Sequence, residues 1–403
     1  MVITQKILRN VSLSAHPAGC RRSVEEQVGW VKAHARQSTD RCYPTTDGLT
    51  LPKRVLILGG STGYGLSSRI VTAFGGGAAT ISVSFEREPS ETRTATAGWY
   101  NTKVFEELAE REGLAAFSLF GDAFSDSIKQ QTADLITKEL GQVDLVVYSL
   151  ASPMRVDPKT GVTYRSVLKP IGEPFTALSV GLESDIVTEA TIEAAEGTQV
   201  EETVRVMGGE DWILWLEYLG ERNLLAVGCK TVAYSYIGPA ITYPVYREGT
   251  IGRAKEHLEA SAKELDRLLA PIGGRAFVSV NKALVTRASA VIPVVPLYMA
   301  LLYRVMKDAD LHEQCTEQIY RLFTTILYAE GPIPTDSEGR LRVDDWEMRS
   351  DIQREVEARW RFQREGEPIT GGDLEGVRAE YDQIHGFGYP DIDYTADVDP
   401  RVV

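Results

Sequence analysis

Residues 54–70 have the sequence RVLILGGSTGYGLSSRI, an apolar run followed by a glycine-rich turn and the beginning of a helix. The run 55–58 predicts a parallel strand that is buried on both faces. Gly59, Gly63 and Gly65 allow a tight turn, a close backbone approach to a pyrophosphate and close packing of the helix on the strand. The helix would direct its free N–H groups toward the phosphates. We therefore predict a dinucleotide-binding turn at this position.

A second apolar segment, residues 79–85, predicts the neighbouring strand and ends at Glu86, about 20 residues after Gly65. A carboxylate at this distance accepts hydrogen bonds from the adenine ribose hydroxyls. Glu86 would repel a 2′-phosphate, so NADH is favoured over NADPH, although Arg87 and Arg93 lie nearby and partly offset the repulsion. The alternative for Glu86 is a solvated acid at the end of a strand.

The chain has 403 residues, of which 43% are hydrophobic and 25% are charged, as in an ordinary globular protein. Its formal net charge of −14 leaves no positive excess for phosphates, so we expect no general nucleic-acid binding. The apolar run 288–303 contains two prolines and is shorter than a membrane-spanning helix. The N-terminal residues lack the apolar core of a secretion signal. These features favour a soluble, cytoplasmic protein without a membrane partner.

The cysteines and histidines do not have the spacing of a metal site. The cysteines are also scattered too widely to indicate a disulfide framework in a chain of this size. We therefore expect reduced thiols and no metal ion. The four cysteines are Cys20, Cys42, Cys229 and Cys315.

Predicted strands and helices alternate from residue 54 onward. This alternation predicts an α/β fold in which right-handed crossovers build a doubly wound parallel sheet. An amphipathic helix at 24–35 precedes the sheet. Strands are expected at 54–59, 79–85, 115–120, 143–149, 224–233 and 276–286, and helices at 64–73, 98–112, 126–140, 211–223 and from Pro293 and Pro296 to Asp308.

Five segments make up the predicted domain organisation. Residues 1–53 form an N-terminal extension that packs on the core. Residues 54–153 form the nucleotide-binding half of the core, and residues 216–309 form the catalytic half. Residues 154–215 interrupt the alternation and predict an inserted substrate cap. Residues 310–403 form a mostly helical C-terminal segment and tail.

Two loops, residues 121–124 and 149–153, follow the carboxyl ends of predicted strands. Loops at these ends form the ligand crevice of doubly wound sheets. Asp122 is a candidate to accept a hydrogen bond from the adenine amino group or to cap the following helix. The inserted segment carries basic residues that suit either an anionic substrate or an ordinary solvated hairpin: Arg155, Lys159, Arg165 and Lys169.

The segment TVAYSYIGPAITYPVYREGTIGRAK contains four tyrosines and ends at Lys255. Short-chain reductases need a tyrosine and a lysine together, because the phenol donates to a developing oxyanion while the ammonium group lowers the phenol pKa and holds the nicotinamide ribose. On one continuous helix, Tyr246 and Lys255 would lie about half a turn out of phase. Gly249 and Gly252 separate them, so we expect the helix to begin near Thr250 and Tyr246 to reach back toward Lys255.

Tyr236 lies near the carboxyl end of the predicted strand. Ala233 stands where ketone-reducing relatives of this type usually carry a serine, which argues against ketone reduction, although Ser235 is close by. Packing is the alternative role for each tyrosine taken alone. Together, Tyr236, Tyr246 and Lys255 predict a reductase active site.

Long motifs run through the chain: GGSTGYGLSSRI (59–70), SFE (84–86), GDAFSD (121–126), VVYSLASP (146–153), MGGEDW (207–212), YSYIG (234–238), YREGTIGRAKEHLE (246–259) and VNKALVTRASAVIPVVPLY (280–298). With these motifs, almost the whole chain resembles the trans-2-enoyl-CoA reductase family, the FabV type of enoyl-thioester reductase. The resemblance implies NADH-dependent reduction of the C2=C3 double bond of a trans-2-enoyl thioester of CoA or acyl carrier protein. It also implies a Rossmann-type core with a small cap, and a monomer.

The resemblance further implies roles for individual residues. Tyr246 resembles the family's proton donor, Lys255 its cofactor-positioning lysine, and Tyr236 the substrate-binding tyrosine near the thioester carbonyl. We therefore expect hydride delivery to the β carbon, a phenol hydrogen bond to the enolate oxygen and protonation of the α carbon. The implied cofactor contacts are Gly59, Gly60, Ser61, Thr62, Gly63, Tyr64, Phe85, Glu86, Asp122, Ala123, Leu150, Ala151, Lys255, Leu284, Val285 and Thr286.

Two other functions are compatible with the motifs. A carbonyl-reducing short-chain dehydrogenase would convert a ketone and ignore crotonyl-CoA. A redox-sensing NADH-binding protein would keep the fold without turnover, and the presence of both Tyr246 and Lys255 argues against it.

Overall fold

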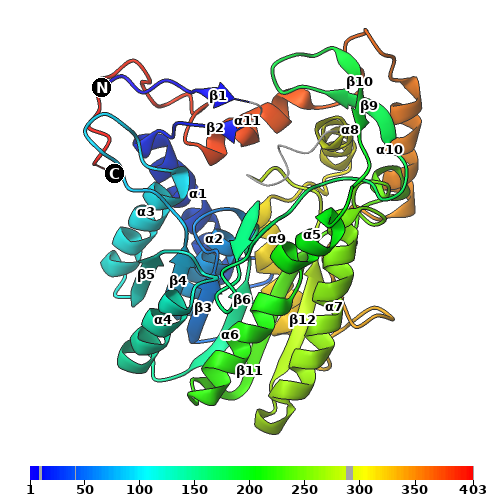
Figure 1. Cartoon of the computed structure of the whole chain (residues 1–403). Coiled ribbons are helices and arrows are strands. Elements are labelled where there is room, and N and C mark those ends of the chain that lie inside the picture. Colours follow the sequence, from blue (N-terminus) through cyan, green and yellow to red (C-terminus); the bar gives the residue numbers. More distant parts are fainter. Residues whose placement is uncertain (9–10, 41, 287–293, 403) are drawn as a thin grey trace.

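The computed structural model describes residues 1–8, 11–40, 42–286 and 294–402. At its centre is a seven-stranded sheet in which every pair of neighbouring strands is parallel (Figure 1). The chain enters the sheet at β3 and winds outward through β4 and β5, then starts again at β6 and winds outward on the other side. This order confirms the predicted doubly wound α/β fold. In sheet order the strands are β13 (Leu341–Arg342), β12 (Arg275–Val280), β11 (Leu225–Ser235), β6 (Val143–Tyr148), β3 (Arg54–Leu58), β4 (Ala79–Ser84) and β5 (Ala116–Phe120).

Helices cover both faces of the sheet because its central strands are apolar on both sides. On β3, Val55 and Ile57 belong to the hydrophobic cluster of one face and Leu56 and Leu58 to that of the other, and all four are fully buried. The first face is covered by α1 (Pro17–Arg36), α2 (Gly63–Ile70), α3 (Ala97–Arg111) and α9 (Cys315–Arg321), and the second by α4 (Asp126–Glu139), α6 (Glu210–Glu221) and α7 (Thr250–Leu269).

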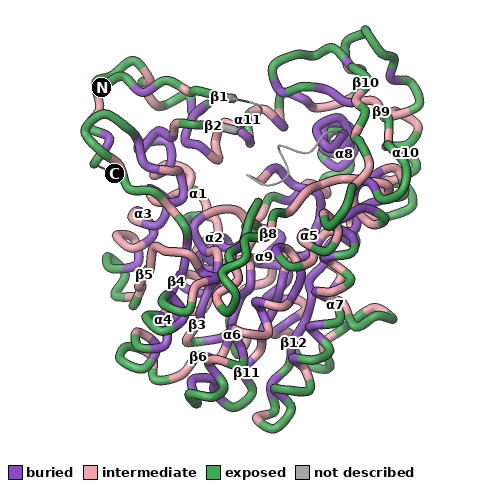
Figure 2. The backbone as a smooth tube through the Cα atoms, viewed as in Figure 1, coloured by how far each residue is buried: buried purple, intermediate pink, exposed green. Residues whose placement is uncertain are grey.

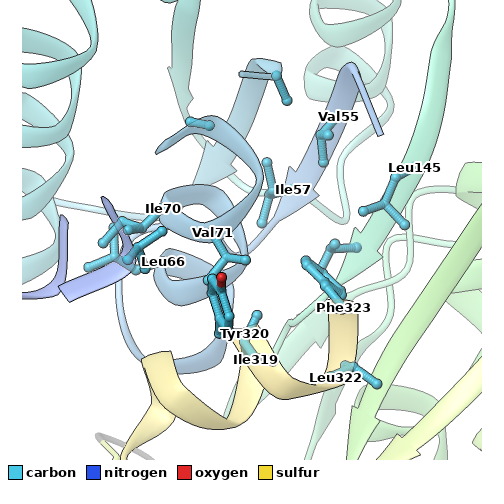
Figure 3. Close-up of a cluster of buried hydrophobic side chains, with 14 of the residues drawn as sticks. Val55, Ile57, Leu66, Ile70, Val71, Leu145, Ile319, Tyr320, Leu322 and Phe323 are labelled. Atoms are coloured by element: carbon cyan, nitrogen blue, oxygen red, sulfur yellow. The ribbon is translucent and has the colours of Figure 1, made fainter. Parts of the chain in front are cut away.

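The C-terminal segment is part of the first face. Figure 3 shows Tyr320 and Phe323 packed against β3 and α2, and both are fully buried. Because the segment also contributes the edge strand β13, the core includes residues that are almost 300 positions beyond β3 in the sequence. The tail returns to the N-terminus, where the Met1 amino group donates a hydrogen bond to the Val398 carbonyl.

A third hydrophobic cluster lies beyond the carboxyl ends of β11 and β12. Its centre is α8 (Val295–Asp308), which is buried around most of its surface (Figure 2). The hairpin β9 (Phe175–Val180) and β10 (Val187–Ile192) packs on α8 and also hydrogen-bonds to the C-terminal segment, from the Val187 N–H to the Glu367 carbonyl. The other helices of this layer are α10 (Ser350–Phe362) and α11 (Leu374–Ile384).

The prediction that the last core strand reaches residue 286 is wrong, because β12 ends at Val280. The Asn281 N–H still donates to the Ser235 carbonyl of β11, but the backbone then hydrogen-bonds to side chains: the Ala283 N–H donates to Glu347 and the Val285 N–H to the Tyr303 hydroxyl. Residues 281–286 therefore form an irregular segment at the carboxyl edge of the sheet.

Other boundaries shift without changing the topology. The helix predicted at 64–73 ends at Ile70 and continues as a π-helical turn at Val71–Gly75, and the one predicted at 24–35 is the longer α1. The insertion begins with a short hairpin of β7 (Met154–Val156) and β8 (Thr163–Arg165), and near its end it contains an additional helix, α5 (Gln199–Met207).

Pro296 lies in the first turn of α8, where a proline is tolerated, and Pro293 lies outside the described residues. The N-terminal extension also carries a short hairpin, β1 (Ile7–Leu8) and β2 (Val11–Ser12). None of the helices within the described ranges combines the length and the apolar character that crossing a bilayer requires.

Candidate active site

The turn between β3 and α2 has the geometry of a phosphate cradle. Gly59 has φ +88°, and a Cβ atom there would lie 2.3 Å from the Ser149 carbonyl oxygen. A Cβ on Gly65 would lie 2.0 Å from the Gly59 carbonyl, so the helix packs on the turn as only glycine permits. The N-cap residue Thr62 makes no side-chain capping hydrogen bond, which leaves first-turn N–H groups of α2 available to an anion. The turn thus fits the pyrophosphate of a dinucleotide.

The other residues of the turn are held by neighbours. Ser61 is buried and its hydroxyl donates to Glu86 Oε1 at 2.7 Å, while Gly60 packs with its Cα against β3 and β4. The Tyr64 hydroxyl donates to the Lys282 carbonyl at 2.9 Å, so the first turn of α2 is tied to the segment that follows β12.

Glu86 and Phe85 follow β4 and lie beside the glycine turn. Gly98, in the first turn of α3, leaves room for the Glu86 carboxylate, because a Cβ on Gly98 would lie 2.2 Å from Glu86 Oε1. The Phe85 ring is 82% exposed, an unusual state for a phenylalanine at a strand end. An exposed flat ring beside a carboxylate fits a base stacked on Phe85 and ribose hydroxyls that donate to Glu86.

The loop after β5 is fixed by a buried ion pair. The carbonyl of Ala123 accepts a hydrogen bond from Lys129 Nζ at 3.2 Å, and Lys129 pairs with Asp211 at 2.8 Å, both only 2% exposed. The alternative role of Asp122 as a helix cap is wrong, because Ser125 caps α4 and Asp122 instead accepts from the backbone N–H two residues later. This hydrogen bond holds Asp122 in the loop that follows the carboxyl end of β5.

The loops after β6 and β12 flank the glycine turn. Leu150 Cδ2 lies 3.2 Å from the position of a Cβ on Gly59, and Thr286 Cγ2 lies 3.7 Å from that of a Cβ on Gly63. Ala151 is exposed, Leu284 and Val285 are buried, and Thr286 is half-buried. The predicted cofactor contacts described so far come from five separate parts of the sequence. They lie together at the carboxyl ends of the parallel strands.

Tyr236 and Tyr246 form a pair on the catalytic side of this edge. Tyr236 follows β11, and Tyr246 lies in the turn before α7. Their ring centroids are 4.9 Å apart with the planes at 80°. Burial raises the pKa of both phenols, so each keeps its proton at neutral pH. The pair thus presents neutral hydrogen-bond donors.

The Tyr246 hydroxyl makes no hydrogen bond with another residue of the described part of the chain, whereas the Tyr236 hydroxyl lies 3.1 Å from Glu347 Oε1. Of the two phenols, Tyr246 has its proton uncommitted.

Lys255 lies in α7, which begins at Thr250 as predicted. Its ammonium group donates to the Tyr234 carbonyl at 3.3 Å, and burial lowers the pKa of Lys255 to about 8. A Cβ on Gly252 would lie 2.5 Å from the Tyr246 carbonyl, so this glycine lets α7 start against the turn that carries the tyrosine. Within the described ranges no hydrogen bond joins Lys255 to Tyr246. The Lys255 ammonium group lies next to the end of β11 instead.

Sequence reasoning missed two members of the cluster, Glu347 and Tyr298. Glu347 is fully buried and its carboxylate accepts hydrogen bonds from the Tyr298 hydroxyl and from the Ala283 N–H, both at 2.7 Å. Glu347 lies in the stretch DDWEMRS with no recognisable motif, and it follows Tyr236 by 111 positions. No local pattern could have placed it at the site.

Among the described residues, apolar side chains pack closely around Tyr246 and leave no space between them that would admit a water molecule. This group includes Phe175 of the inserted segment, and its other members are Thr242, Val245, Val294 and Val295. Arg155 is not available to an anionic substrate, because it is buried and paired with Glu210 at 2.7 Å, whereas Lys159 and Arg165 are exposed and Lys169 is half-buried.

Three family models match the chain. Residues 93–328 match the trans-2-enoyl-CoA reductase catalytic region, and residues 2–91 match the NAD(P)H binding domain of trans-2-enoyl-CoA reductase. Residues 335–398 match a model described as an enoyl reductase FAD binding domain.

The residues of the third match do not fit a flavin dinucleotide. β13 is two residues long, and no glycine lies between it and α10. The helices α10 and α11 instead bury Val356 and Val377 against α8. We therefore assign no flavin step to this segment.

Relatives match over the whole length. The enoyl-[acyl-carrier-protein] reductase [NADH] of Flavobacterium johnsoniae is 50% identical over 402 residues, which cover 100% of this chain and 98% of the relative. The protein of the same name from Coxiella burnetii is 51% identical over 401 residues, which cover 99% and 96%.

Solved structures agree. The crystal structure of Treponema denticola trans-2-enoyl-CoA reductase in complex with NAD superposes with a TM-score of 0.94 at 48% identity, covering 99% of this chain and 98% of that one. The Clostridium acetobutulicum trans-2-enoyl-CoA reductase in complex with NADH gives a TM-score of 0.93 at 43% identity, with the same coverage. By its sequence, its fold and the arrangement of its glycine turn and tyrosine pair, the chain belongs to the trans-2-enoyl-CoA reductase family.

Proposed function

We propose that the protein reduces the C2=C3 double bond of trans-2-enoyl thioesters of CoA or acyl carrier protein with NADH, in fatty-acid metabolism. One observation carries this proposal. Tyr236, Tyr246 and Lys255 lie at the same end of the parallel sheet, the carboxyl ends of its strands, as the glycine turn and Glu86. Relatives of about 50% identity are named enoyl-[acyl-carrier-protein] reductase [NADH], which supports the same reaction and cofactor.

NADH supplies the hydride that adds to the β carbon of the enoyl group. In this proposal, the uncommitted hydroxyl of Tyr246 donates a hydrogen bond to the thioester oxygen as negative charge develops there, and is the source of the proton for the product. Tyr236 is the second donor to that oxygen. Such donors act strongly in a buried site because they need no reorganisation during the reaction.

Lys255 supports the donors through its charge. Its ammonium group is held by the Tyr234 carbonyl at 3.3 Å, close to where the chain leaves β11 toward Tyr236. A positive charge there stabilises an oxyanion and suits a ribose hydroxyl of the cofactor.

The inserted segment, residues 154–215, is proposed as the substrate cap. Its Phe175 belongs to the group of apolar side chains around Tyr246, and the backbone N–H of Thr250 donates to the Lys169 carbonyl at 2.9 Å. The cap is thereby fastened to the start of the catalytic helix α7. We also propose that the protein is a monomer, as the family resemblance implies, and that it is located in the cytoplasm.

The test is loss of NADH absorbance with purified protein and crotonyl-CoA, and separately with a crotonyl thioester of acyl carrier protein. Oxidation of NADH that depends on either thioester, with formation of the butyryl product, is expected. A protein that binds NADH but oxidises it with neither thioester, or that reduces a ketone instead, would overturn the proposal.

A further inference from the structure

Four hydrogen bonds end on Glu347, three on its carboxyl group and one on its backbone carbonyl. Oε1 lies 2.7 Å from the Tyr298 hydroxyl and 3.1 Å from the Tyr236 hydroxyl, and Oε2 lies 2.7 Å from the Ala283 nitrogen. Gln353 Nε2 donates both to the Glu347 backbone carbonyl at 2.7 Å and to the Tyr298 oxygen at 3.1 Å. One carboxyl group therefore joins a candidate catalytic tyrosine to the irregular segment after β12.

The direction of most of these bonds is determined by chemistry. A backbone N–H can only donate, so Oε2 must accept from Ala283. The Gln353 amide nitrogen faces a carbonyl and is therefore the donor to Tyr298, which leaves the Tyr298 proton for Oε1 of Glu347. Only the bond between Tyr236 and Glu347 can run in either direction.

The two directions have different consequences at the site. When Glu347 is ionised, the Tyr236 hydroxyl donates to it, and its single proton is directed away from any substrate oxygen. When Glu347 carries a proton on Oε1, it donates to the Tyr236 oxygen, and the Tyr236 proton is free to face the substrate. We propose that Glu347 is a positioning residue whose proton decides whether Tyr236 donates a hydrogen bond to the thioester oxygen; this inference rests on the proposed reductase function.

Burial and the neighbouring groups act on the pKa of Glu347 in opposite directions. The carboxyl group is fully buried, which raises the pKa of Glu347, while the facing hydroxyl of Tyr298 and the charge of Lys282 oppose that rise. The other groups that face it are Tyr236 at the end of β11, with Tyr246 beside it, and Asp344 on its own segment, which adds a like charge. Protonation of Glu347 leaves no group without a hydrogen-bond partner, because the Tyr236 oxygen can accept the added proton.

The proposal predicts the pH dependence of turnover. In the wild type, kcat should fall as pH rises through the pKa of Glu347, in addition to any fall that comes from Lys255 near pH 8. In Glu347→Gln, the amide oxygen must accept from Ala283, so the NH₂ group stands at the position of Oε1 and donates to the Tyr236 oxygen, as a protonated carboxyl group does. Its second N–H faces the Tyr298 oxygen, so the hydrogen bond that Tyr298 donates to Glu347 is lost. This variant should keep kcat within about tenfold of the wild-type value at low pH, and its pH profile should have one ionisation fewer.

A second variant moves the ionisation instead of removing it. Tyr298→Phe deletes one donor to the carboxylate, so the anion is less stable and the pKa of Glu347 rises. The Glu347-dependent fall in kcat should shift upward by about one to two pH units. The control is Glu317→Gln on α9, where burial also raises the pKa of Glu317 but the side chain only takes part in a capping box that an amide can maintain. Its profile should match the wild type.

The experiment measures kcat with NADH and crotonyl-CoA from pH 5 to pH 9 for the full-length wild type and the three variants. A Glu347→Gln profile that superposes on the wild type would overturn the inference. If Glu347→Gln fails to fold, an unshifted Tyr298→Phe profile overturns it equally. A wild-type protein without turnover would refute the proposed function itself, so the two failures are distinguishable.

Discussion

Replacing Tyr246 by phenylalanine tests the assignment of the proton donor with little structural change. The substitution keeps the ring that packs edge-on against Tyr236 at 4.9 Å and removes only the hydroxyl. No residue in the described part of the chain has that hydroxyl as a hydrogen-bond partner, so the change leaves no orphaned donor or acceptor behind. Stability should therefore stay within about 0.5 kcal/mol of the wild type.

The rate should fall steeply. Loss of one preorganised donor to a developing oxyanion costs about 2.7–4 kcal/mol, or about 10²–10³ in kcat. Because Glu86 and the glycine turn are separate from the tyrosine pair, NADH affinity should change less than about twofold. A drop in kcat and kcat/KM without a change in NADH binding is typical of an interaction made only in the transition state.

The assay is steady-state loss of NADH absorbance with crotonyl-CoA, accompanied by a fluorescence titration with NADH and a urea unfolding curve. Tyr243→Phe is a matched control, since Tyr243 lies in the same turn and is half-buried like Tyr246. Near-normal kcat in Tyr246→Phe, with the loss appearing in Tyr236→Phe instead, would refute the assignment. A loss that is accompanied by unfolding or by weaker NADH binding would refute the reasoning about the hydroxyl.

Three further predictions concern single charges. Glu86→Gln should lower the ratio of kcat/KM for NADH over NADPH by at least about tenfold, equal to about 1.4 kcal/mol, because the charge that repels a 2′-phosphate is gone; an unchanged ratio contradicts this role. Burial lowers the pKa of Lys255 to about 8, so its ammonium form and kcat should be lost as pH rises through about 8, and Lys255→Met should show a low rate without that decline. Burial among the rings of Phe387 and Tyr394 lowers the pKa of His16, so the folded protein keeps His16 neutral while the unfolded chain binds a proton below about pH 6.5. The free energy of unfolding should therefore fall with acidification through that range. The difference between the urea midpoints at pH 7.5 and pH 5.5 should be smaller in His16→Phe than in the wild type; an equal difference in both proteins would contradict this.

The sequence by itself determined the features that depend on neighbouring residues. An apolar run followed by Gly59 and Gly65 requires a buried strand, a tight turn and a closely packed helix, because the period of the side chains and the steric freedom of glycine are local properties. The same holds for Gly252, whose position correctly predicted where α7 begins relative to Tyr246. Alternating strands and helices then leave a doubly wound parallel sheet as the arrangement that buries both faces.

Only the tertiary structure decided which distant side chains complete the site. Glu347 joins Tyr236, Tyr298 and Ala283 because the C-terminal segment folds back onto the sheet edge, and no periodicity in the stretch around residue 347 encodes that return. The early end of β12 has the same cause: a carboxylate and the Tyr303 hydroxyl take the backbone N–H groups that a neighbouring strand would otherwise bind. Local patterns specify elements, whereas contacts between residues far apart in the sequence depend on how the completed elements pack.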